Sequence, residues 1–361
     1  MDYSNAKLIL ETADLEPGSV TWKSPSNLAI VKYWGKFGDQ LPKNPSVSFT
    51  LENAVTETTL EYKAKKNADQ QISLELFFHD EPQPEFAQKT AKFLERLTPV
   101  FPFLRQLDLT IRTQNSFPHS AGIASSASSM SALALCLCSL EDNLFQTLGE
   151  DNDFDRKASY IARLGSGSAC RSIYPYMALW GQHSEVPGSS DLYAIPIEEN
   201  LHPVYQSFHD DILIVSSEEK AVSSTQGHSL MDHHPFADVR YNQARQNIHF
   251  LLESLRNGDL EAFGRIAESE ALTLHALMMA SNPGYILMHP HTVTLIERVR
   301  QFREETKHPL YFSLDAGPNL HLLYPESIIH EVRPFIESEL LPFCEDQYYL
   351  PDWVGEGPEQ L

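Results

Sequence analysis

Residues 115–129 read NSFPHSAGIASSASS and lead directly into a strongly apolar stretch, MSALALCLCSL, at 130–140. The apolar stretch predicts a buried helix, so the small residues before it form a loop that opens a helix. Backbone N–H groups at such a helix start point outward and meet the positive end of the helix dipole, which suits a phosphate. A serine-rich N-cap on a core helix explains the same residues equally well. The loop has neither the G-x-x-x-x-G-K-[ST] nor the G-x-G-x-x-G spacing, which disfavours P-loop NTPases and Rossmann folds.

Two further segments favour the phosphate-binding interpretation. Residues 24–37 read SPSNLAIVKYWGKF, in which two lysines flank a tyrosine–tryptophan pair, and residues 165–172 read GSGSACRS. Taken singly, the first is consistent with the end of an amphipathic strand and the second with a flexible turn. Three basic or glycine- and serine-rich segments far apart in the sequence are harder to explain by turns alone. Their residue types fit a site for several phosphates.

The same segments carry a resemblance to a known family. Residues 118–127, PHSAGIASSA, match the P-x-x-x-G-L/I-x-S-S-A phosphate loop of the GHMP small-molecule kinase superfamily. Within it, the chain specifically resembles the diphosphomevalonate decarboxylases, whose N-I-A-x-x-K-Y-W-G-K and G-S-G-S-A-C-R-S motifs correspond to 27–36 and 165–172. The family's V-S-S-T-x-G and D-A-G-P-N motifs correspond to 222–227 and 315–319. These motifs follow the family order over most of the chain, and jointly they are highly specific.

The strands and helices expected in the C-terminal half have the pattern of an α+β layer, and the resemblance implies an α+β fold for the whole chain. The resemblance implies a GHMP kinase-like fold with a ribosomal S5 domain 2-like domain at 1–208 and a ferredoxin-like domain at 209–361, with the active site in the cleft between them. A proline-rich stretch at 182–210 contains the boundary, and the tail at 351–361 is expected to be an exposed end. We expect strands at 19–22, 28–33, 46–51, 55–62, 72–78, 107–112, 211–216, 310–314, 320–324 and 347–350, and helices at 84–98, 130–140, 153–164, 238–255, 260–279, 291–304 and 326–339.

The formal net charge of −22 argues against nucleic acid or an anionic membrane as a partner. It also means that a polyanionic substrate must bind at a local positive island, because the overall field repels it. We expect this island to be formed from a small group of basic side chains: Lys23, Lys32, Lys36, Lys43 and Arg171.

The sequence also bears on location. The first 18 residues carry acidic side chains and lack the apolar core of a signal peptide, and the longest apolar stretch is too short to span a bilayer. The four cysteines show no CxxC spacing. We therefore expect reduced thiols in a cytoplasmic protein. A homodimer is an expectation from the resemblance alone.

Asp315 follows the strand expected at 310–314 and precedes Ala-Gly-Pro-Asn, so its residue type alone favours a turn. The resemblance makes it the catalytic carboxylate, which orients a substrate hydroxyl and accepts its proton; both interpretations can hold together. Lys32 is expected to stabilise the transferring phosphoryl group. Arg171 is expected to hold the departing carboxylate with its planar fork.

The resemblance also implies residues that bind ATP, Mg²⁺ and the substrate. The expected cofactor-binding residues belong to the phosphate loop: Pro118, Gly122, Ile123, Ala124, Ser125 and Ser126, with Ser126 also a metal ligand. The expected substrate-binding residues come from the other motifs: Tyr33, Lys36, Ser166, Ser168, Arg171, Ser224 and Thr225, with Ser223 as a further hydroxyl whose simpler interpretation is a capped turn.

The activity implied is ATP-dependent decarboxylation of (R)-5-diphosphomevalonate to isopentenyl diphosphate, through phosphorylation of the 3-hydroxyl. Alternatives are a related enzyme acting on mevalonate 5-phosphate, a mevalonate 3-kinase without decarboxylation, and a non-catalytic isoprenoid-phosphate-binding protein. Three departures from the family pattern leave the substrate open: Phe37 where arginine is common, Pro45 where a serine hydroxyl is expected, and His228 where methionine is common.

Histidines gather at 228–234 and at 289–291. A zinc site is disfavoured, because His233 and His234 are adjacent and no second pair of ligands has convincing spacing.

Overall fold

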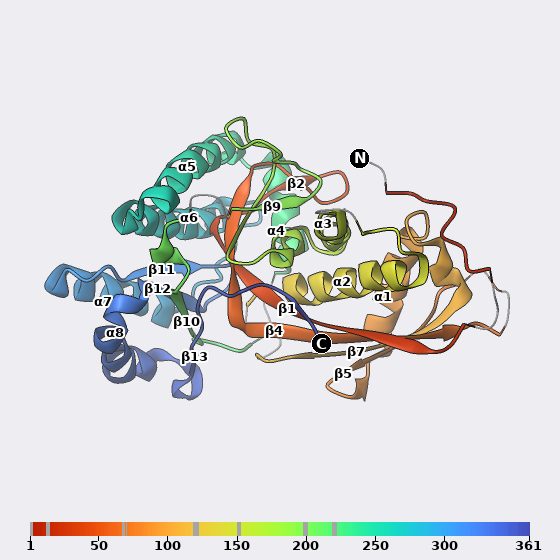
Figure 1. The fold of residues 1–361 in the computed structure, drawn as a ribbon. Coiled ribbons are helices and arrows are strands. Elements are labelled where there is room, and N and C mark those ends of the chain that lie inside the picture. Colours follow the sequence, from red (N-terminus) through yellow and green to blue (C-terminus); the bar gives the residue numbers. More distant parts are fainter. Residues whose placement is uncertain are drawn as a thin grey trace.

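The computed structural model describes residues 3–11, 15–66, 69, 71–117, 123–149, 153–197, 201–218 and 222–361. Two antiparallel-rich sheets organise the chain, one from its N-terminal half and one from its C-terminal half. Figure 1 shows the two parts side by side, the N-terminal sheet with its helices on the right and the C-terminal helices on the left. The structure therefore has the expected α+β architecture.

The first sheet is built on two long strands, β1 (Gly18–Val31) and β4 (Ser46–Ala64), which pair antiparallel over most of their length. One half of β4 also pairs with β7 (Leu107–Asn115), and the other half pairs with β8 (Met177–Trp180). β5 (Ser73–Phe78) then runs parallel to β7. Short strands complete this region: β2 (Lys36–Phe37), β3 (Leu41–Pro42), β6 (Glu81–Pro82), β9 (Ala194–Pro196) and β14 (Glu359–Gln360).

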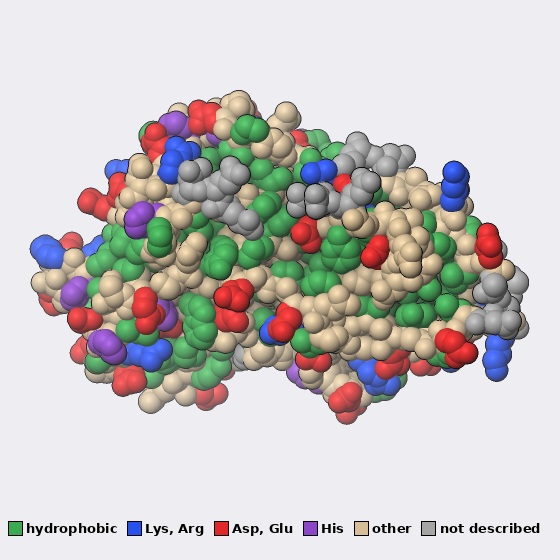
Figure 2. Space-filling view, viewed as in Figure 1, with side chains coloured by type: hydrophobic (Ala, Val, Ile, Leu, Met, Phe, Trp, Pro, Cys, Tyr) green, Lys and Arg blue, Asp and Glu red, His purple; other side chains and the backbone are tan. Residues whose placement is uncertain are grey.

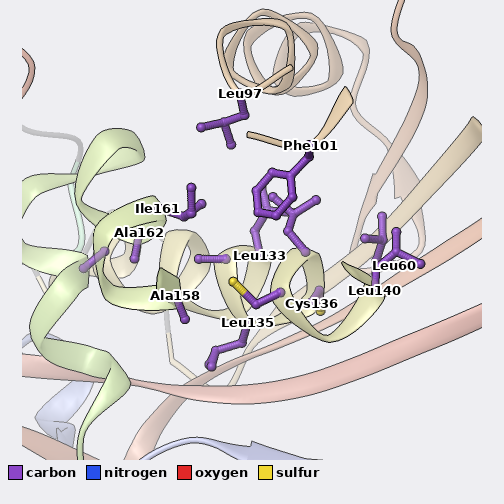
Figure 3. Close-up of a cluster of buried hydrophobic side chains, with 14 of the residues drawn as sticks. Leu60, Leu97, Phe101, Leu133, Leu135, Cys136, Leu140, Ala158, Ile161 and Ala162 are labelled. Atoms are coloured by element: carbon purple, nitrogen blue, oxygen red, sulfur yellow. The ribbon is translucent and has the colours of Figure 1, made fainter. Parts of the chain in front are cut away.

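Helix α2 (Ser125–Phe145) packs against this sheet and lies at the centre of the larger hydrophobic core. Its sequence is apolar on every side, as expected for a helix with neighbours all round. Figure 3 shows its Leu133, Leu135, Cys136 and Leu140 among side chains from the surrounding elements. Those elements include α3 (Asp153–Gly165) and the segment that follows α1 (Pro84–Arg96).

The second sheet has the strand order β11 (Tyr311–Leu314), β12 (Leu320–Pro325), β10 (Phe208–Leu213), β13 (Tyr349–Leu350). Helix α6 (Leu260–Ala280) approaches β11 so closely that a Cβ on Gly264 would lie 2.1 Å from the Tyr311 ring. The helices of this half are α4 (Ser224–Ser229), α5 (Ala237–Asn257), α6 (Leu260–Ala280), α7 (Pro290–Thr306) and α8 (Ile329–Phe335).

Sequence-based expectations are wrong in three respects: the separation of four strands, the extent of one helix and the exposure of the C-terminal tail. The strands expected at 19–22 and 28–33 form one continuous strand, as do those at 46–51 and 55–62, because irregular register steps let the pairing continue through the breaks in alternation. The helix expected at 326–339 ends as α8 after Phe335 and continues as a π-helical turn, since Pro334 lies inside it.

The third correction concerns the tail expected to be exposed at 351–361. Asp352 and Val354 are buried, and β14 adds to the edge of the first sheet beside β1. The Asp352 carboxylate accepts hydrogen bonds from the backbone N–H groups of residues 52–54 at 2.8–2.9 Å. The C-terminal segment therefore joins the second half of the chain to the first sheet.

On the face shown in Figure 2, the described Asp and Glu side chains are dispersed rather than gathered in one patch. All four cysteines are buried and free of disulfides. Among the described residues, no helix combines the length and apolar character that crossing a membrane requires.

Candidate active site

A pocket of about 250 Å³ lies where the end of β1 meets the loop after β11, between the two halves of the chain. It brings together predicted residues from every motif. Those that line it are Lys32, Tyr33, Lys36, Ala124, Ser126, Ser166, Ser168, Arg171, Thr225 and Asp315.

The positive island is smaller than expected, because two of its predicted members have other partners. Lys23 forms an ion pair with Glu359 at 2.6 Å, and the Lys43 ammonium lies 5.3 Å from the centre of the Phe37 ring. The basic side chains of the pocket are therefore Lys32, Lys36 and Arg171.

Lys32 and Asp315 form the ion pair at the centre of the pocket. The Lys32 ammonium lies 2.9 Å from Asp315 Oδ1, and the lysine side chain is only 2% exposed. Asp315 follows β11 directly, and its backbone carbonyl accepts hydrogen bonds from Gly317 N–H at 2.8 Å and from the His275 imidazole at 3.0 Å. Its backbone thus forms the expected turn, while its carboxylate faces the lysine.

A buried ion pair that the sequence did not reveal fixes the backbone of Lys32. Glu270 on α6 accepts hydrogen bonds from the Lys32 N–H at 2.9 Å and from both terminal nitrogens of Arg240 on α5 at 2.5 and 2.7 Å. Arg240 also donates to the Lys32 carbonyl at 3.0 Å. The backbone N–H and the backbone carbonyl of Lys32 are therefore both held by charged side chains from the C-terminal half. No local sequence pattern marks this pair, since its two members lie 30 residues apart on different helices.

Arg171 is fully buried with neutral partners. Its guanidinium donates to Ser48 Oγ at 2.7 Å, to Ser46 Oγ at 2.6 Å and to Asn27 Oδ1 at 3.3 Å. Asn27 is itself oriented by donating to Ser172 Oγ at 2.8 Å. Burial lowers the pKa of Arg171, since the charged form loses its hydration. An anionic group entering the pocket would therefore gain a strong, directional partner.

The 165–172 segment contacts Tyr33 through Gly167. A Cβ on Gly167 would lie 2.8 Å from the tyrosine oxygen, so only glycine permits this approach. The Tyr33 hydroxyl is buried and makes no hydrogen bond to a described residue. Ser166 Oγ lies 3.3 Å from Ser126 Oγ, which joins this segment to the start of α2.

The described part of the phosphate loop does not place a serine at the N-cap of α2. Pro118 and Gly122 lie outside the described residues. Ala124 precedes α2 in the left-handed conformation (φ 42°) and offers no capping side chain, while Ser125 and Ser126 already lie inside the helix. The first-turn N–H groups of α2 therefore lack the expected serine N-cap. Ser126 lines the pocket, whereas Ile123 is buried and its carbonyl accepts from Ser26 Oγ at 2.7 Å.

A second, mostly apolar pocket of about 280 Å³ begins at the same helix start. It shares Ser126 with the first pocket, contains Ser125, and runs along α2 between α1 and the sheet. Its apolar walls include Phe78 and Met130. At its edge the buried Asn115 amide nitrogen makes no hydrogen bond to a described residue.

Helix α4 closes the first pocket from the C-terminal half. Ser223 caps it by accepting from Gln226 N–H at 3.2 Å, so the capped-turn interpretation of this serine is confirmed. Thr225 lines the pocket, and the side chain of Ser224 lies outside what the structure describes. Lys36 donates to Gln40 Oε1 at 2.9 Å, and partial burial lowers its pKa.

The three departures from the family pattern have different surroundings. His228 lines the pocket, Phe37 is 44% exposed, and Pro45 packs against Gly181. Within the described ranges, no cluster of three or more His, Cys, Asp or Glu side chains could hold a metal ion.

The fold and the pocket together define a two-domain enzyme of the GHMP kinase type. A helix start that no described side chain caps, an ion-paired carboxylate and a buried guanidinium lie around one cavity. Sequence profiles then identify the family. The profile for the diphosphomevalonate decarboxylase-like N-terminal domain matches residues 24–194, and that for the mevalonate 5-diphosphate decarboxylase C-terminal domain matches 211–351.

Individual relatives agree with the profiles. The chain is 30% identical over 315 residues to a diphosphomevalonate decarboxylase of Eremothecium gossypii, covering 83% of this chain and 76% of that protein. It is 29% identical over 353 residues to one of Bos taurus, covering 92% and 83%. The chain therefore belongs to the diphosphomevalonate decarboxylase family.

Solved structures show the same likeness. The mevalonate diphosphate decarboxylase of Legionella pneumophila superposes with a TM-score of 0.77 at 28% identity, covering 92% of this chain and 100% of that one. The protein MDDEF, solved with MVAPP, AMPPCP and magnesium, superposes with a TM-score of 0.80 at 26% identity, covering 96% and 99%.

Proposed function

We propose that this protein uses ATP to decarboxylate (R)-5-diphosphomevalonate to isopentenyl diphosphate, a step of the mevalonate route. The observation that carries the proposal is the arrangement of Lys32, Asp315 and Arg171 around one pocket: an ion-paired carboxylate beside a buried guanidinium with neutral partners. A kinase that only phosphorylates needs Lys32 and Asp315. Decarboxylation adds the requirement for a group that holds a carboxylate.

The reaction follows from these roles. Asp315 accepts the proton of the 3-hydroxyl as its oxygen attacks the γ-phosphorus of ATP, which breaks the bond to ADP. Lys32 stabilises the negative charge of the transferring phosphoryl group. The C3–O bond then breaks with its electron pair leaving on phosphate, and positive charge develops at the tertiary carbon. Loss of CO₂ returns the electron pair of the C–C bond to form the alkene.

Arg171 would hold the substrate carboxylate so that its C–C bond is aligned with the departing phosphate. The plane of its guanidinium is already fixed, because Ser46, Ser48 and Asn27 accept hydrogen bonds from it. A lysine could supply the charge but not the plane.

The residues present fit ATP and Mg²⁺. The start of α2, which no side chain in the described part of the loop caps, suits the phosphates. The adjoining apolar pocket with its buried Asn115 amide suits a flat nucleobase. Ser126 would supply a hydroxyl to Mg²⁺, with Pro118, Gly122 and Ala124 shaping the loop. Bound Mg²⁺ would neutralise charge on the ATP phosphates.

The diphosphate end of the substrate would be held by hydroxyl and ammonium groups. Tyr33 contributes a buried hydroxyl that makes no hydrogen bond to a described residue, and Lys36 contributes a charge. Ser166 and Ser168 would donate from the 165–172 segment, and Ser224 and Thr225 from the second domain.

Several finer features belong to the same proposal. We place the domains at 1–208 and 209–361. The two separate sheets support this division, although Phe208 already begins β10 of the second sheet and β14 returns to the first. A cytoplasmic location fits four cysteines that are all free and buried. A homodimer rests on the family resemblance.

One assay tests the proposed function against its alternatives. The purified protein is incubated with ATP, Mg²⁺ and mevalonate, its 5-phosphate or its 5-diphosphate, and ADP and CO₂ are measured separately. We expect both products, with the 5-diphosphate as the preferred substrate. Preference for the 5-phosphate would identify the monophosphate enzyme. ADP without CO₂ would identify the 3-kinase, and the absence of both products would identify the binding protein.

A further inference from the structure

His228 lies in the wall of the pocket although it is 93% buried. Its imidazole packs between two rings of the 32–36 segment, with centroids 4.4 Å from Tyr33 and 4.7 Å from Trp34. The preceding residue sets this position, because a Cβ on Gly227 would lie 2.6 Å from the Trp34 ring. Helix α4 therefore presents the imidazole to the pocket in one fixed place.

The hydrogen bonds of the ring determine its tautomer. The Gly35 N–H donates to His228 Nδ1 at 2.9 Å, so Nδ1 is an acceptor and the proton of the neutral ring lies on Nε2. Burial, together with the nearby Lys36 charge, lowers the pKa of His228 to about 3. The ring is therefore a neutral donor at neutral pH.

We propose that His228 is a specificity-determining residue that donates its Nε2–H to the non-reacting phosphate end of the substrate, an inference that rests on the proposed function. Methionine, common at this position in the family, has no donor to offer. A histidine here thus offers a directional contact that a methionine at the same position could not make.

The position of His228 indicates which end of the substrate it contacts. Lys32 and Asp315 are ion-paired at the reacting centre. His228 instead neighbours Lys36 and packs at a tilt against Tyr33, whose buried hydroxyl makes no hydrogen bond to a described residue. A lysine, a tyrosine hydroxyl and an imidazole N–H form a donor set of the kind that binds a phosphate. Because the imidazole is neutral, it adds a donor without adding a buried charge.

The test compares two substitutions at this position with a matched control. His228→Met removes the donor and restores the residue common in relatives. His228→Gln keeps an N–H near the place of Nε2. His249→Met makes the same chemical change at an exposed histidine on α5, paired with Glu185 at 2.7 Å and outside the pocket lining.

We expect His228→Met to raise the dissociation constant of 5-diphosphomevalonate, measured by calorimetry without nucleotide, by roughly tenfold or more, the effect of losing a hydrogen bond to a charged group. The affinity for an ATP analogue and the kcat should stay within a few-fold of wild type. His228→Gln should recover part of the lost affinity, and His249→Met should match wild type.

Unchanged substrate affinity in His228→Met, or equal losses in His228→Met and His228→Gln, would overturn the inference. A loss of kcat and of ATP-analogue affinity in parallel with substrate affinity would also overturn it, since that indicates a general structural role. These outcomes are separate from failure of the proposed function, which would appear as a wild-type protein that neither binds the diphosphate nor releases CO₂ from it.

Discussion

Glu270→Gln is the substitution whose consequences follow most directly from the geometry. The Glu270 carboxylate is completely buried and accepts four hydrogen bonds, from the Lys32 N–H, from two nitrogens of Arg240 and from the Asn247 amide at 2.6 Å. An amide in its place keeps one oxygen but turns an NH₂ group toward donors. It also leaves the Arg240 charge buried without a counter-charge.

Removing one partner of a buried ion pair typically costs about 3–5 kcal/mol of folding free energy, and we expect Glu270→Gln to lie in this range. We also expect turnover to fall by about tenfold or more, because the Lys32 backbone loses one of its anchors and a misplaced catalytic group is costly. The measurements are the free energy of unfolding from urea titration followed by fluorescence, and the rate of ADP release.

Glu268→Gln on the same helix is the matched control. Glu268 binds the two terminal nitrogens of Arg303 at 2.6 and 3.2 Å, so the chemistry of the pair is the same. This pair is partly exposed and outside the first pocket. We therefore expect a cost of about 1 kcal/mol and normal turnover.

Equal costs for the two substitutions, with turnover unchanged in both, would refute the positioning role of Glu270. If Glu270→Gln does not fold, Asn247→Ala provides a milder change. It removes one of the four donors to Glu270 and should lower stability by about 1 kcal/mol, with a measurable fall in turnover.

Three further predictions concern the pocket. Arg171→Lys keeps the charge but loses the planar fork, so CO₂ release should fall on the order of 10²-fold. Near-normal CO₂ release would show that Arg171 does not hold the substrate carboxylate. Asp315→Asn keeps an acceptor for Lys32 but cannot take a proton, so thermal melting should stay near wild type while ADP release falls roughly 10²–10⁴-fold; turnover within a few-fold of wild type would contradict the catalytic role. Because burial lowers the pKa of His228 from 6.5 to about 3, the unfolded chain binds more protons between these values and stability falls as pH drops through this window. Wild type should therefore lose about 2 kcal/mol more unfolding free energy than His228→Met between pH 7 and pH 5, and parallel pH profiles of the two proteins would contradict this.

The sequence predicted the features that depend on local pattern. Alternating and helical periodicity located most strands and helices, and the motif segments supplied Lys32, Arg171 and Asp315, which do line one pocket. These residues are recognisable because turn chemistry and phosphate chemistry restrict residue types over short stretches. The roles of these residues in the reaction remain predictions.

Features that depend on distant partners could not be predicted in this way. The buried pair of Glu270 and Arg240 has no local signature, because each residue alone looks like a charged position on an amphipathic helix. The tail at 351–361 has a polar, proline-containing sequence, yet the backbone N–H groups of 52–54 and the edge of β1 hold it in place. Only the three-dimensional arrangement shows where such partners lie.

The most direct test of the central claim is the ratio of CO₂ to ADP that the wild-type protein forms from 5-diphosphomevalonate, ATP and Mg²⁺ in a single incubation. The proposed roles of Asp315 and Arg171 at one pocket predict that phosphorylation and decarboxylation are coupled, so the two products should form in equal amounts throughout the reaction. ADP formed in clear excess over CO₂, with a stable 3-phosphorylated product accumulating, would contradict the account.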